Sequence, residues 1–227
     1  MIEPRAIWTS DRSLDLTLPQ GESAGESARR AAALARVLRR ADLPWLVDAA
    51  GCEDLVGVII DPRAQGAAGA GRELEILAAQ VRSVQLEEAQ REHILPVCYG
   101  SGHGEDLERA AQILGFSSQS VIKMHSSAIY QVVSVGFSPG FAYLAGLPAE
   151  LQLPRLEKPR PRVPAGSVAM AEDRTAVYPH ATAGGWLLIG RCSTRLFNPH
   201  SDHPALLRVG DRVRFKPVEA DTVECIR

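Results

Sequence analysis

The chain has 227 residues, of which 45% are hydrophobic and 23% charged, and its formal net charge is −2. This length is enough for one large or two small globular domains, and the balanced charge excludes a general attraction to nucleic acid or to an anionic membrane surface. The cysteines form no C-x-x-C pair, which argues against a structural zinc site. The N-terminal segment has no apolar signal-peptide core, and no apolar run reaches the ~20 residues that span a bilayer, so a reduced, cytoplasmic protein is expected.

The first part of the chain, residues 1–95, is predicted to form a small α+β domain with helices on one face of a sheet. Alternating and amphipathic segments place strands over 5–8, 13–18, 45–50, 54–60 and 93–99, and helices over 23–41 and 71–84. Ser23 and Glu26 have the spacing of a capping box at the start of the first helix. We expect a turn at Gly51, between two strands, and a flexible loop in the Ala/Gly-rich residues 64–71.

Residues 96–128 are predicted to form a helical connector, and residues 129–227 an all-β domain. The connector contains two short helical patterns, one ending at Gly115 as a left-handed cap and one capped by Ser117 or Ser118. Beyond it, short apolar segments are divided by Gly, Pro and Asp-containing turns, and strands are expected over 129–135, 166–171, 175–179, 185–190 and 211–218. Repeated short strands with turn punctuation indicate a β-barrel or sandwich.

Four segments of the second half occur in one order: VGFSPGFAYLAGLP at 135–148, LPRLEKPRPRVPAGSVAMA at 153–171, AVYPHATAGGWLLIGR at 176–191 and LLRVGDRVRF at 206–215. Together they resemble the signature of the allophanate hydrolase subunit 1 family. The resemblance implies an N-terminal ferredoxin-like domain and a C-terminal cyclophilin-like β-barrel. The family commonly has S-P-G-G-W where this chain has T-A-G-G-W at 182–186, and Thr where it has Cys192.

That family includes subunits of ATP-dependent 5-oxoprolinases, which open 5-oxo-L-proline to L-glutamate. The resemblance therefore implies a B-type hydrolase subunit that is inactive alone and works with a C-type and an A-type subunit, with ATP and Mg²⁺ used by the assembled complex. It leaves two alternatives open: a KipI-like inhibitor of a sensor histidine kinase, and an allophanate or urea carboxylase-related subunit. The chain itself carries no G-x-x-x-x-G-K-[ST] phosphate loop, and the run YGSGHG at 99–104 is interpreted as a flexible connector rather than an anion site.

A basic, proline-rich segment is the first candidate binding feature. It contains Arg155, Arg160 and Arg162, and the fixed φ of its prolines limits the entropy lost on binding. Guanidinium groups bind phosphate or carboxylate in a two-pronged geometry. Three anions are compatible with this segment: a nucleotide phosphate, a substrate carboxylate or a partner's acidic residue; alternatively the arginines pair with this chain's own acidic residues. Arg191, in the third motif, is a further candidate.

Small and aromatic residues around the predicted strands form a second group of candidates. Gly166 with Ser167, and Gly184 with Gly185, are positioned to offer backbone donors to an anion, or else are simple turns. Trp186 is a buried anchor or an interface residue, and Tyr178 lies at a barrel rim or in a packed corner. No metal site is expected, because no histidine or cysteine cluster has ligand spacing.

The last candidates are a histidine and an aromatic loop. His125, at the end of a predicted helix, is either a general base or a tie between that helix and the next strand. Ser138 lies in G-F-S-P-G, but the following proline is incompatible with a nucleophile elbow, so a serine hydrolase is not expected. The loop is predicted to form one wall of a site at the barrel mouth, facing a small molecule or another subunit, with these residues: Phe137, Pro139, Gly140, Phe141 and Tyr143.

Overall fold

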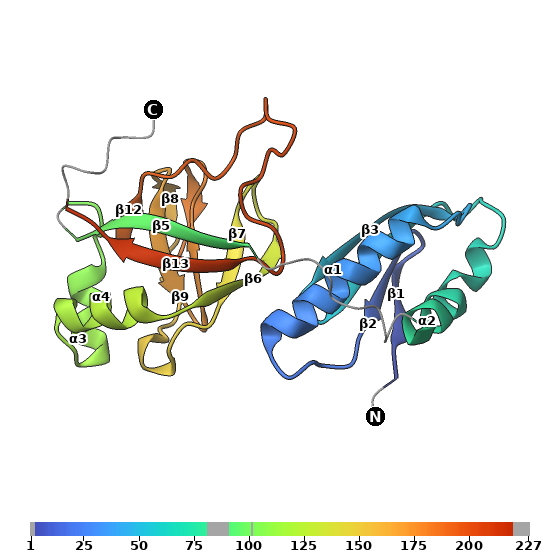
Figure 1. The fold of residues 1–227 in the computed structure, drawn as a ribbon, viewed down its shortest axis with the longest axis horizontal. Coiled ribbons are helices and arrows are strands. Elements are labelled where there is room, and N and C mark those ends of the chain that lie inside the picture. The colour runs from blue at the N-terminus through green and yellow to red at the C-terminus, as the bar shows by residue number, and fades with distance from the viewer. Residues whose placement is uncertain (1–2, 81–90, 101, 220–227) are drawn as a thin grey trace. The chain divides into compact units, whose positions relative to one another are not determined.

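The structure is a computed structural model that describes residues 3–80, 91–100 and 102–219. The chain divides into two units, residues 1–89 and residues 90–227, and each is described by itself (Figure 1). Within the described part of the chain, no helix is long and apolar enough to cross a membrane.

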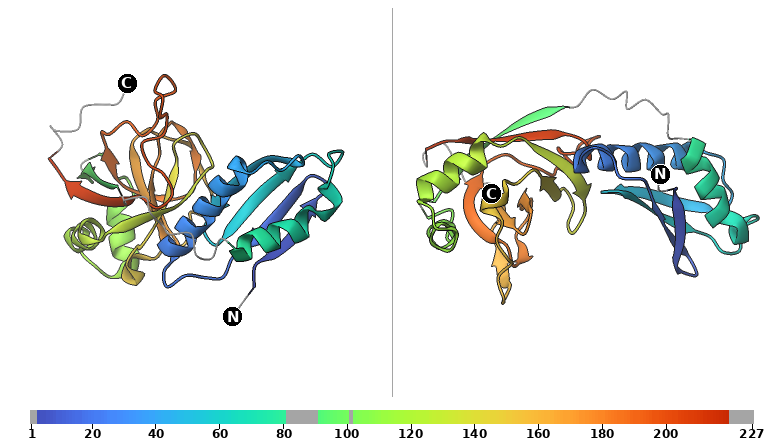
Figure 2. Two further views of the ribbon diagram at one scale, coloured as in Figure 1. Left: turned by 45° about the vertical axis from the view of Figure 1, so that its right-hand side comes forward. Right: turned by 90° about the horizontal axis from the view of Figure 1, so that it is seen from below.

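The first unit is a four-stranded antiparallel sheet with two helices on one face (Figure 2). In chain order its elements are β1 (Arg5–Ser10), β2 (Ser13–Thr17), α1 (Ala24–Arg40), β3 (Leu46–Cys52), β4 (Leu55–Ile60), a 3₁₀ turn at Ala67–Gly69 and α2 (Ala70–Gln80). The strand order in the sheet is β1-β2-β4-β3. Leu14 and Leu16 point to the helices and are fully buried with Leu34 and Leu38 of α1. The predicted α+β character is thus confirmed.

The start of α1 confirms its predicted cap and corrects the rest of the capping box. Ser23 is the N-cap, and its side chain accepts a hydrogen bond from the Glu26 backbone N–H at 3.2 Å. The Glu26 carboxylate, however, accepts from the backbone N–H of Glu22 at 2.8 Å rather than from that of Ser23. The side chain therefore binds one residue further upstream and still satisfies a backbone donor ahead of the first turn.

Two predicted loop features of this unit are wrong. The turn between β3 and β4 falls at Glu53 and Asp54, with Glu53 at φ 52°, and Gly51 lies inside β3. A Cβ at Gly51 would lie 2.5 Å from backbone atoms of Ala31 and Ala32, so this glycine allows α1 to approach the sheet. Of residues 64–71, positions 64–66 lie in a bend and turn, whereas 67–71 form the 3₁₀ turn and the first residues of α2, because a run of alanines favours a helix once its apolar face can pack.

The close approach at Gly51 predicts a specific loss of stability. We expect Gly51→Ala to lower the free energy of unfolding of this unit by roughly 2 kcal/mol, since the added methyl group meets rigid helix backbone. Gly57→Ala, on the neighbouring strand, is the matched control, because the nearest atoms to a Cβ there are 3.9 Å away. Urea unfolding followed at the indole of buried Trp45 measures both variants. Equal losses of unfolding free energy in the two variants would show that the close approach of α1 to Gly51 is not the cause of the loss.

The second unit is a closed seven-stranded barrel with the strand order β10-β7-β6-β13-β5-β12-β9. Its strands are β5 (Glu92–Tyr99), β6 (Tyr130–Val135), β7 (Ala142–Ala145), β9 (Ser167–Ala171), β10 (Arg174–Val177), β12 (Leu187–Cys192) and β13 (Arg212–Pro217). The pair β5 and β13 is parallel and runs side by side in Figure 1, whereas the other pairs are antiparallel. Closure leaves no strand edge unpaired in the barrel wall.

Further short elements attach to this barrel. Strands β8 (Arg160–Val163) and β11 (Thr182–Gly184) form a separate two-stranded ribbon, and a 3₁₀ turn covers Ala149–Leu151. Helices α3 (Leu107–Leu114) and α4 (Ser118–Ser127) have the predicted caps, Gly115 at φ 74° and Ser117 at the N-cap. The sequence pattern did not reveal β7, β8 and β11, because glycine and proline surround or interrupt these segments.

The predicted domain limits differ from the observed division. Strand β5, placed by the sequence at the end of the first domain, pairs with β12 and β13 of the barrel. The predicted connector, residues 96–128, is part of the same unit, since Leu107 and Val121 of its two helices join the barrel core. These partners of β5 lie roughly a hundred residues further along the chain, and local periodicity carries no information about such pairings.

Two buried layers lie on either side of one barrel wall. In β9, Val168 and Met170 face the barrel interior, while Ala169 and Ala171 belong to a second cluster on the opposite face. All five residues of β9 are therefore buried, which explains a continuous apolar pattern in place of the alternation of a half-exposed strand. The second cluster is where most of the candidate residues gather.

Candidate functional site

Five aromatic side chains pack together against the outer side of the wall formed by β7, β10, β9 and β12. We call this group the aromatic face; it comprises Phe137, Phe141, Tyr143, Tyr178 and Trp186. Ring centroids are 4.9 to 6.4 Å apart, and the pairs are arranged edge to face. Beneath them the wall presents small residues, among them Ala169, Ala171 and Ala176, which leave room for the rings. These aromatics belong to separate predicted motifs, and the barrel brings them together.

The loop between β6 and β7 presents the outermost of these rings. The Ser138 N–H donates to the Gly136 carbonyl at 2.7 Å, and Phe137 between them has φ 66°, so this is a γ-turn of the rare positive-φ kind. A β-turn follows, with the Phe141 N–H donating to the Ser138 carbonyl and Gly140 at φ 81°. Phe137 is 61% exposed, whereas Phe141 is buried. Pro139 and Gly140 thus set the turn as predicted, and the strained residue is the exposed phenylalanine.

Tyr178 contributes a buried phenol to the aromatic face. Burial raises the pKa of its phenol, nearby Tyr143 raises it further, and Arg155, the Trp186 backbone N–H and Arg160 oppose the shift. The phenol therefore stays protonated at neutral pH. Its hydroxyl occupies the space over Gly184, where a Cβ would lie 2.4 Å from the oxygen. Gly184 is thus needed for close packing of this hydroxyl rather than as a backbone donor.

This packing predicts that Gly184→Ala displaces Tyr178. We expect a loss of roughly 1 to 2 kcal/mol of unfolding free energy, because the phenol must move out of its packed position. Gly185→Ala is the control, since its Cβ would meet only ordinary contacts at 3.6 Å and beyond. The measurement is urea unfolding of both variants together with the tyrosine ring NMR resonances. An unshifted Tyr178 resonance in Gly184→Ala would contradict the expectation.

Of the predicted arginines, Arg160 alone has a charged partner that is itself buried. Its Nη2 donates to Asp106 Oδ1 at 2.7 Å, and its Nε lies 3.6 Å from Glu105. Arg155 forms a two-pronged pair with Glu172 in which both side chains are 56% exposed, which is the pairing with the chain's own acidic residues that the sequence left open. Arg162 is exposed and Arg191 half-buried; among the residues described here, neither has a charged partner within ion-pair distance.

Asp106, which the sequence did not single out, organises the position of Arg160. It is 4% exposed, and its second oxygen accepts from the Leu188 N–H at 2.7 Å. The residue precedes α3, so its carboxylate joins that helix to β12 and to the β8 ribbon. An acidic residue before a helix is common and usually a cap, so the sequence alone does not mark this role; Asp106 makes no side-chain cap hydrogen bond.

Gly166 and Ser167, and two residues of the glycine-rich run, use their backbone donors within the fold. Gly166 N–H donates to the Tyr178 carbonyl and Ser167 N–H to that of Pro164, which makes this pair a turn. In the run 99–104, the N–H groups of His103 and Gly104 donate to the Gly100 carbonyl. These donors are occupied, and the buried Asp106 carboxylate lies at the same helix start, so the described residues do not fit a phosphate cradle for ATP.

His125 has both ring nitrogens engaged and is fully buried in the barrel core. Its Nδ1 is 2.8 Å from the Tyr99 hydroxyl, and its Nε2 is 2.9 Å from Thr175 Oγ1. Because the Thr175 hydroxyl donates to a backbone carbonyl, it accepts from Nε2–H, and Nδ1 accepts from Tyr99. Burial lowers the pKa of the imidazole to about 3. These contacts tie α4 to the barrel, and they leave neither nitrogen open to a reacting group.

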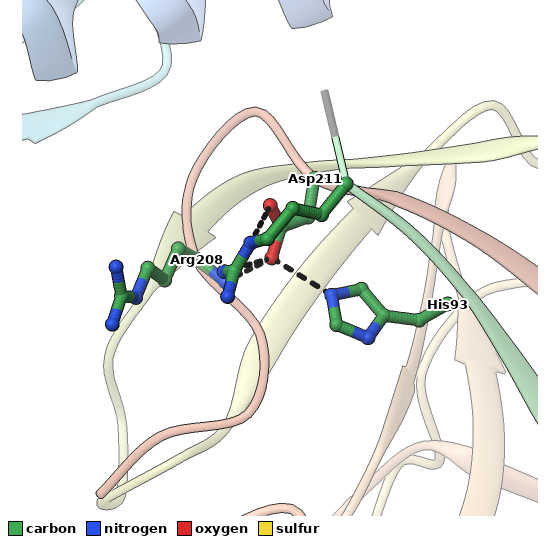
Figure 3. A network of polar contacts seen from close by, with 4 residues as sticks. His93, Arg208 and Asp211 are labelled. Carbon is green, nitrogen blue, oxygen red and sulfur yellow. Dashed lines mark hydrogen bonds and ion pairs between the residues drawn. The ribbon is translucent and has the colours of Figure 1, made fainter. Parts of the chain in front are cut away.

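A second buried carboxylate, missed by the sequence reasoning, joins the first residues of the barrel unit to its last strand (Figure 3). Asp211 is 6% exposed and accepts from Arg91 at 2.7 and 3.2 Å. It also lies 3.1 Å from His93 Nε2 and accepts from the Arg208 N–H at 2.9 Å. The network fixes the starts of the parallel strands β5 and β13 against each other. Its G-D pair resembles an ordinary turn in sequence, so nothing local marks it.

Among the described residues, no group of three or more His, Cys, Asp or Glu side chains is placed to hold a metal ion. The aromatic face offers apolar walls and a neutral phenol, and one guanidinium held by a buried carboxylate lies next to it.

The chain belongs to the family described as carboxyltransferase domain, subdomain C and D, which it matches over residues 4–207. It is similar to three curated proteins whose names identify them as B-type subunits of 5-oxoprolinase: 50% identical over 135 residues to that of Escherichia coli O157:H7, 47% over 121 residues to that of Bacillus subtilis, and 42% over 143 residues to that of Haemophilus influenzae.

These matches cover only part of each protein. They span 60%, 53% and 63% of this chain, and 62%, 50% and 66% of the three relatives. Among solved structures, the chain is similar to TTHA0988, with a TM-score of 0.77 and 39% identity over 92% of this chain and 40% of that one. The Kluyveromyces lactis urea amidolyase shares the fold, with a TM-score of 0.77 at 17% identity, over 97% of this chain and 15% of that one.

Proposed function

We propose that the chain is a B-type subunit of an ATP-dependent 5-oxoprolinase, which converts 5-oxo-L-proline to L-glutamate. The observation that carries this proposal is the name shared by the three curated relatives at 42 to 50% identity. Because those relatives carry the oxoprolinase name, they favour this function over the kinase-inhibitor and urea carboxylase alternatives.

We propose that the chain acts in the cytoplasm with a C-type and an A-type subunit and has no turnover alone. Two observations support shared chemistry. The chain spans only 40% of its solved relative TTHA0988, so that relative contains further polypeptide, and the described residues of the glycine-rich run at 99–104 do not fit a phosphate cradle. ATP and its Mg²⁺ would then be held chiefly by other subunits, and this chain would supply recognition.

We propose a finer fold assignment for both units. Starting from β2, the first unit runs β-α-β-β-α, and β1 lies beside β2 as the remaining strand; this supports a ferredoxin-like fold whose last strand is supplied by the start of the chain. The closed mixed barrel with α3 and α4 packed against it supports a cyclophilin-like second unit.

We propose that the aromatic face and the residues that support it are the recognition surface of this subunit. The support is their convergence on one outer wall of the barrel, with an exposed ring at its rim. His125 stays a catalytic candidate only if the core opens, because its ring nitrogens are bonded inside the barrel.

Reconstitution tests the proposed function. The chain is purified with its C-type and A-type partners, and ATP hydrolysis and glutamate formation are measured with and without 5-oxo-L-proline. We expect both only when all components and 5-oxo-L-proline are present, and neither with this chain alone. Glutamate formation that persists when the chain is omitted, or ATP hydrolysis indifferent to 5-oxo-L-proline, would refute the proposal. Autophosphorylation of a sensor histidine kinase, unchanged on addition of the chain, is the parallel control.

A further inference from the structure

Two buried side-chain atoms lack a hydrogen-bond partner in the part of the chain that the structure describes, Ser138 Oγ and Arg160 Nη1. Both lie next to the aromatic face: Ser138 lies in the turn that presents Phe137 and Phe141, and Arg160 lies opposite Gly184, over which the Tyr178 hydroxyl packs. Buried polar groups are nearly always paired, so each unpaired one requires an explanation, such as a bound molecule that supplies the partner.

Arg160 is held so that one nitrogen stays available. Asp106 accepts from Nη2 at 2.7 Å, and its other oxygen is fixed by the Leu188 N–H, so the carboxylate cannot turn to serve a second guanidinium nitrogen. Glu105 lies on the Nε side at 3.6 Å. Nη1 therefore keeps its donors, and a donor on a charged group gains most from an ionised acceptor.

Besides the Asp106 and Glu105 carboxylates, the aromatic face lies next to the strand position of Arg160. Tyr178 is neutral, with its hydroxyl packed over Gly184 next to the strand position of Arg160, and the Tyr143 and Trp186 rings lie beside it on the alanine-lined wall. Apolar walls with one well-placed charged donor are typical of sites for small organic anions. Inorganic phosphate could bind the guanidinium, but it has no apolar surface to pack against the aromatic rings.

We propose that the aromatic face binds a small monocyclic carboxylate, with its carboxylate on Arg160 Nη1 and its ring against the aromatic side chains. This proposal rests on the proposed function and extends it, since it assigns the carboxylate of 5-oxo-L-proline to this chain rather than to a partner. Asp106 is a positioning residue, because it acts through Arg160.

We propose that Phe137 moves when the ligand binds. Arg160 Nη1 is closed to solvent in the structure, so a ligand reaches it only after a side chain moves. Phe137 is the most exposed ring of the aromatic face, its ring centroid lies 5.2 Å from that of Phe141 and 6.4 Å from that of Tyr178, and its positive φ is that of a strained turn.

Ligand binding to the full chain tests the proposal without any turnover. The indole N–H resonance of each tryptophan is followed by NMR during titration with 5-oxo-L-proline, with 2-pyrrolidinone, which lacks the carboxylate, and with acetate, which lacks the ring. We expect 5-oxo-L-proline to shift the Trp186 resonance at the lowest concentration, and the other two to need at least about tenfold more, the loss of one charge-assisted hydrogen bond. Trp8 and Trp45 lie in the other unit and serve as internal controls.

Two variants show which groups carry the affinity. Arg160→Lys keeps the positive charge but loses the planar guanidinium with its paired N–H donors. We therefore expect the affinity for 5-oxo-L-proline to fall at least about tenfold. Arg214→Lys is the matched control, an ion-paired arginine on β13 bound to Glu92 at 3.0 Å and outside the aromatic face; its affinity should equal that of the wild type. If Arg160→Lys fails to fold, the comparison of 5-oxo-L-proline with 2-pyrrolidinone in the wild type decides. Equal binding of the two, no binding, or a shift of Trp8 or Trp45 alone would overturn the proposal.

The outcomes separate this inference from the proposed function. Turnover in the reconstituted complex without binding to the chain would leave the function standing and place the carboxylate site on another subunit. Binding at Trp186 without turnover would leave the site standing and refute the 5-oxoprolinase assignment.

Discussion

At pH 4.5 we expect the barrel unit to be about 3 kcal/mol less stable than at pH 7 on account of one side chain, His125. Burial lowers the pKa of this imidazole to about 3 in the folded chain, against 6.5 in an exposed one. Between these values the unfolded state binds a proton that the folded state does not, so acidification favours unfolding. The contribution is complete above pH 6.5 and is lost at roughly 1.4 kcal/mol per pH unit as the pH falls towards 3.

The variant His125→Gln isolates this effect from that of the carboxylates. Glutamine cannot titrate, so its stability should be lower than that of the wild type at pH 7 but should change less between pH 7 and 4.5. His203→Gln is the control, because His203 is exposed and its replacement should leave the wild-type pH profile intact. The urea unfolding transition of the barrel, followed at the Trp186 indole, gives the three profiles. Parallel profiles for wild type and His125→Gln would mean that the imidazole is not held neutral.

The same histidine shows what sequence reasoning can and cannot decide. A histidine at the end of a short helix was compatible with catalysis and with a structural tie, because its neighbours in sequence do not include Tyr99 or Thr175. Those partners come from β5 and β10, on different parts of the barrel. Which role applies depends on tertiary contacts, and only the fold supplies them.

Local features were the most predictable. The Ser23 and Ser117 caps, the left-handed Gly115 and the strands with clear apolar patterns all depend on interactions within a few residues. The family resemblance added a barrel, which the structure confirms as closed. The limits of the domains were less predictable, since the position of β5 depends on pairing with β13 at the far end of the chain.

The candidate site was predictable as a set of residue types but not as an arrangement. The aromatics of the motifs lie together on one wall of the barrel, whereas the basic and glycine residues among them have different roles. Arg155 pairs at the surface, Gly184 makes room for a phenol, and Gly166 closes a turn. The organising carboxylate, Asp106, lies some fifty residues before the arginine it holds, and no motif connects the two.

Asp106 should be among the most sensitive positions of the barrel. We expect Asp106→Ala to lower the unfolding free energy by roughly 3 kcal/mol, because it leaves the Leu188 N–H and a largely buried guanidinium without an acceptor. Asp106→Asn keeps an acceptor for the backbone N–H and should lose roughly half as much. Glu92→Ala, which breaks the exposed pair with Arg214, is the control and should cost less than about 1 kcal/mol.

A double-mutant cycle with Arg160→Met distinguishes a buried charge pair from a simple packing defect. We expect the loss of unfolding free energy in Asp106→Ala to come mainly from a buried guanidinium left without its carboxylate partner. In that case, the same substitution in the Arg160→Met background should cause a loss smaller by at least about 1 kcal/mol. The remaining cost reports the unpaired Leu188 N–H, which Arg160→Met does not restore. Urea unfolding of the four proteins at pH 7, followed at the Trp186 indole, completes the cycle. Additive effects would show that Asp106 and Arg160 act independently, and Asp106 would then be a structural residue of α3 and β12 with no part in positioning the arginine.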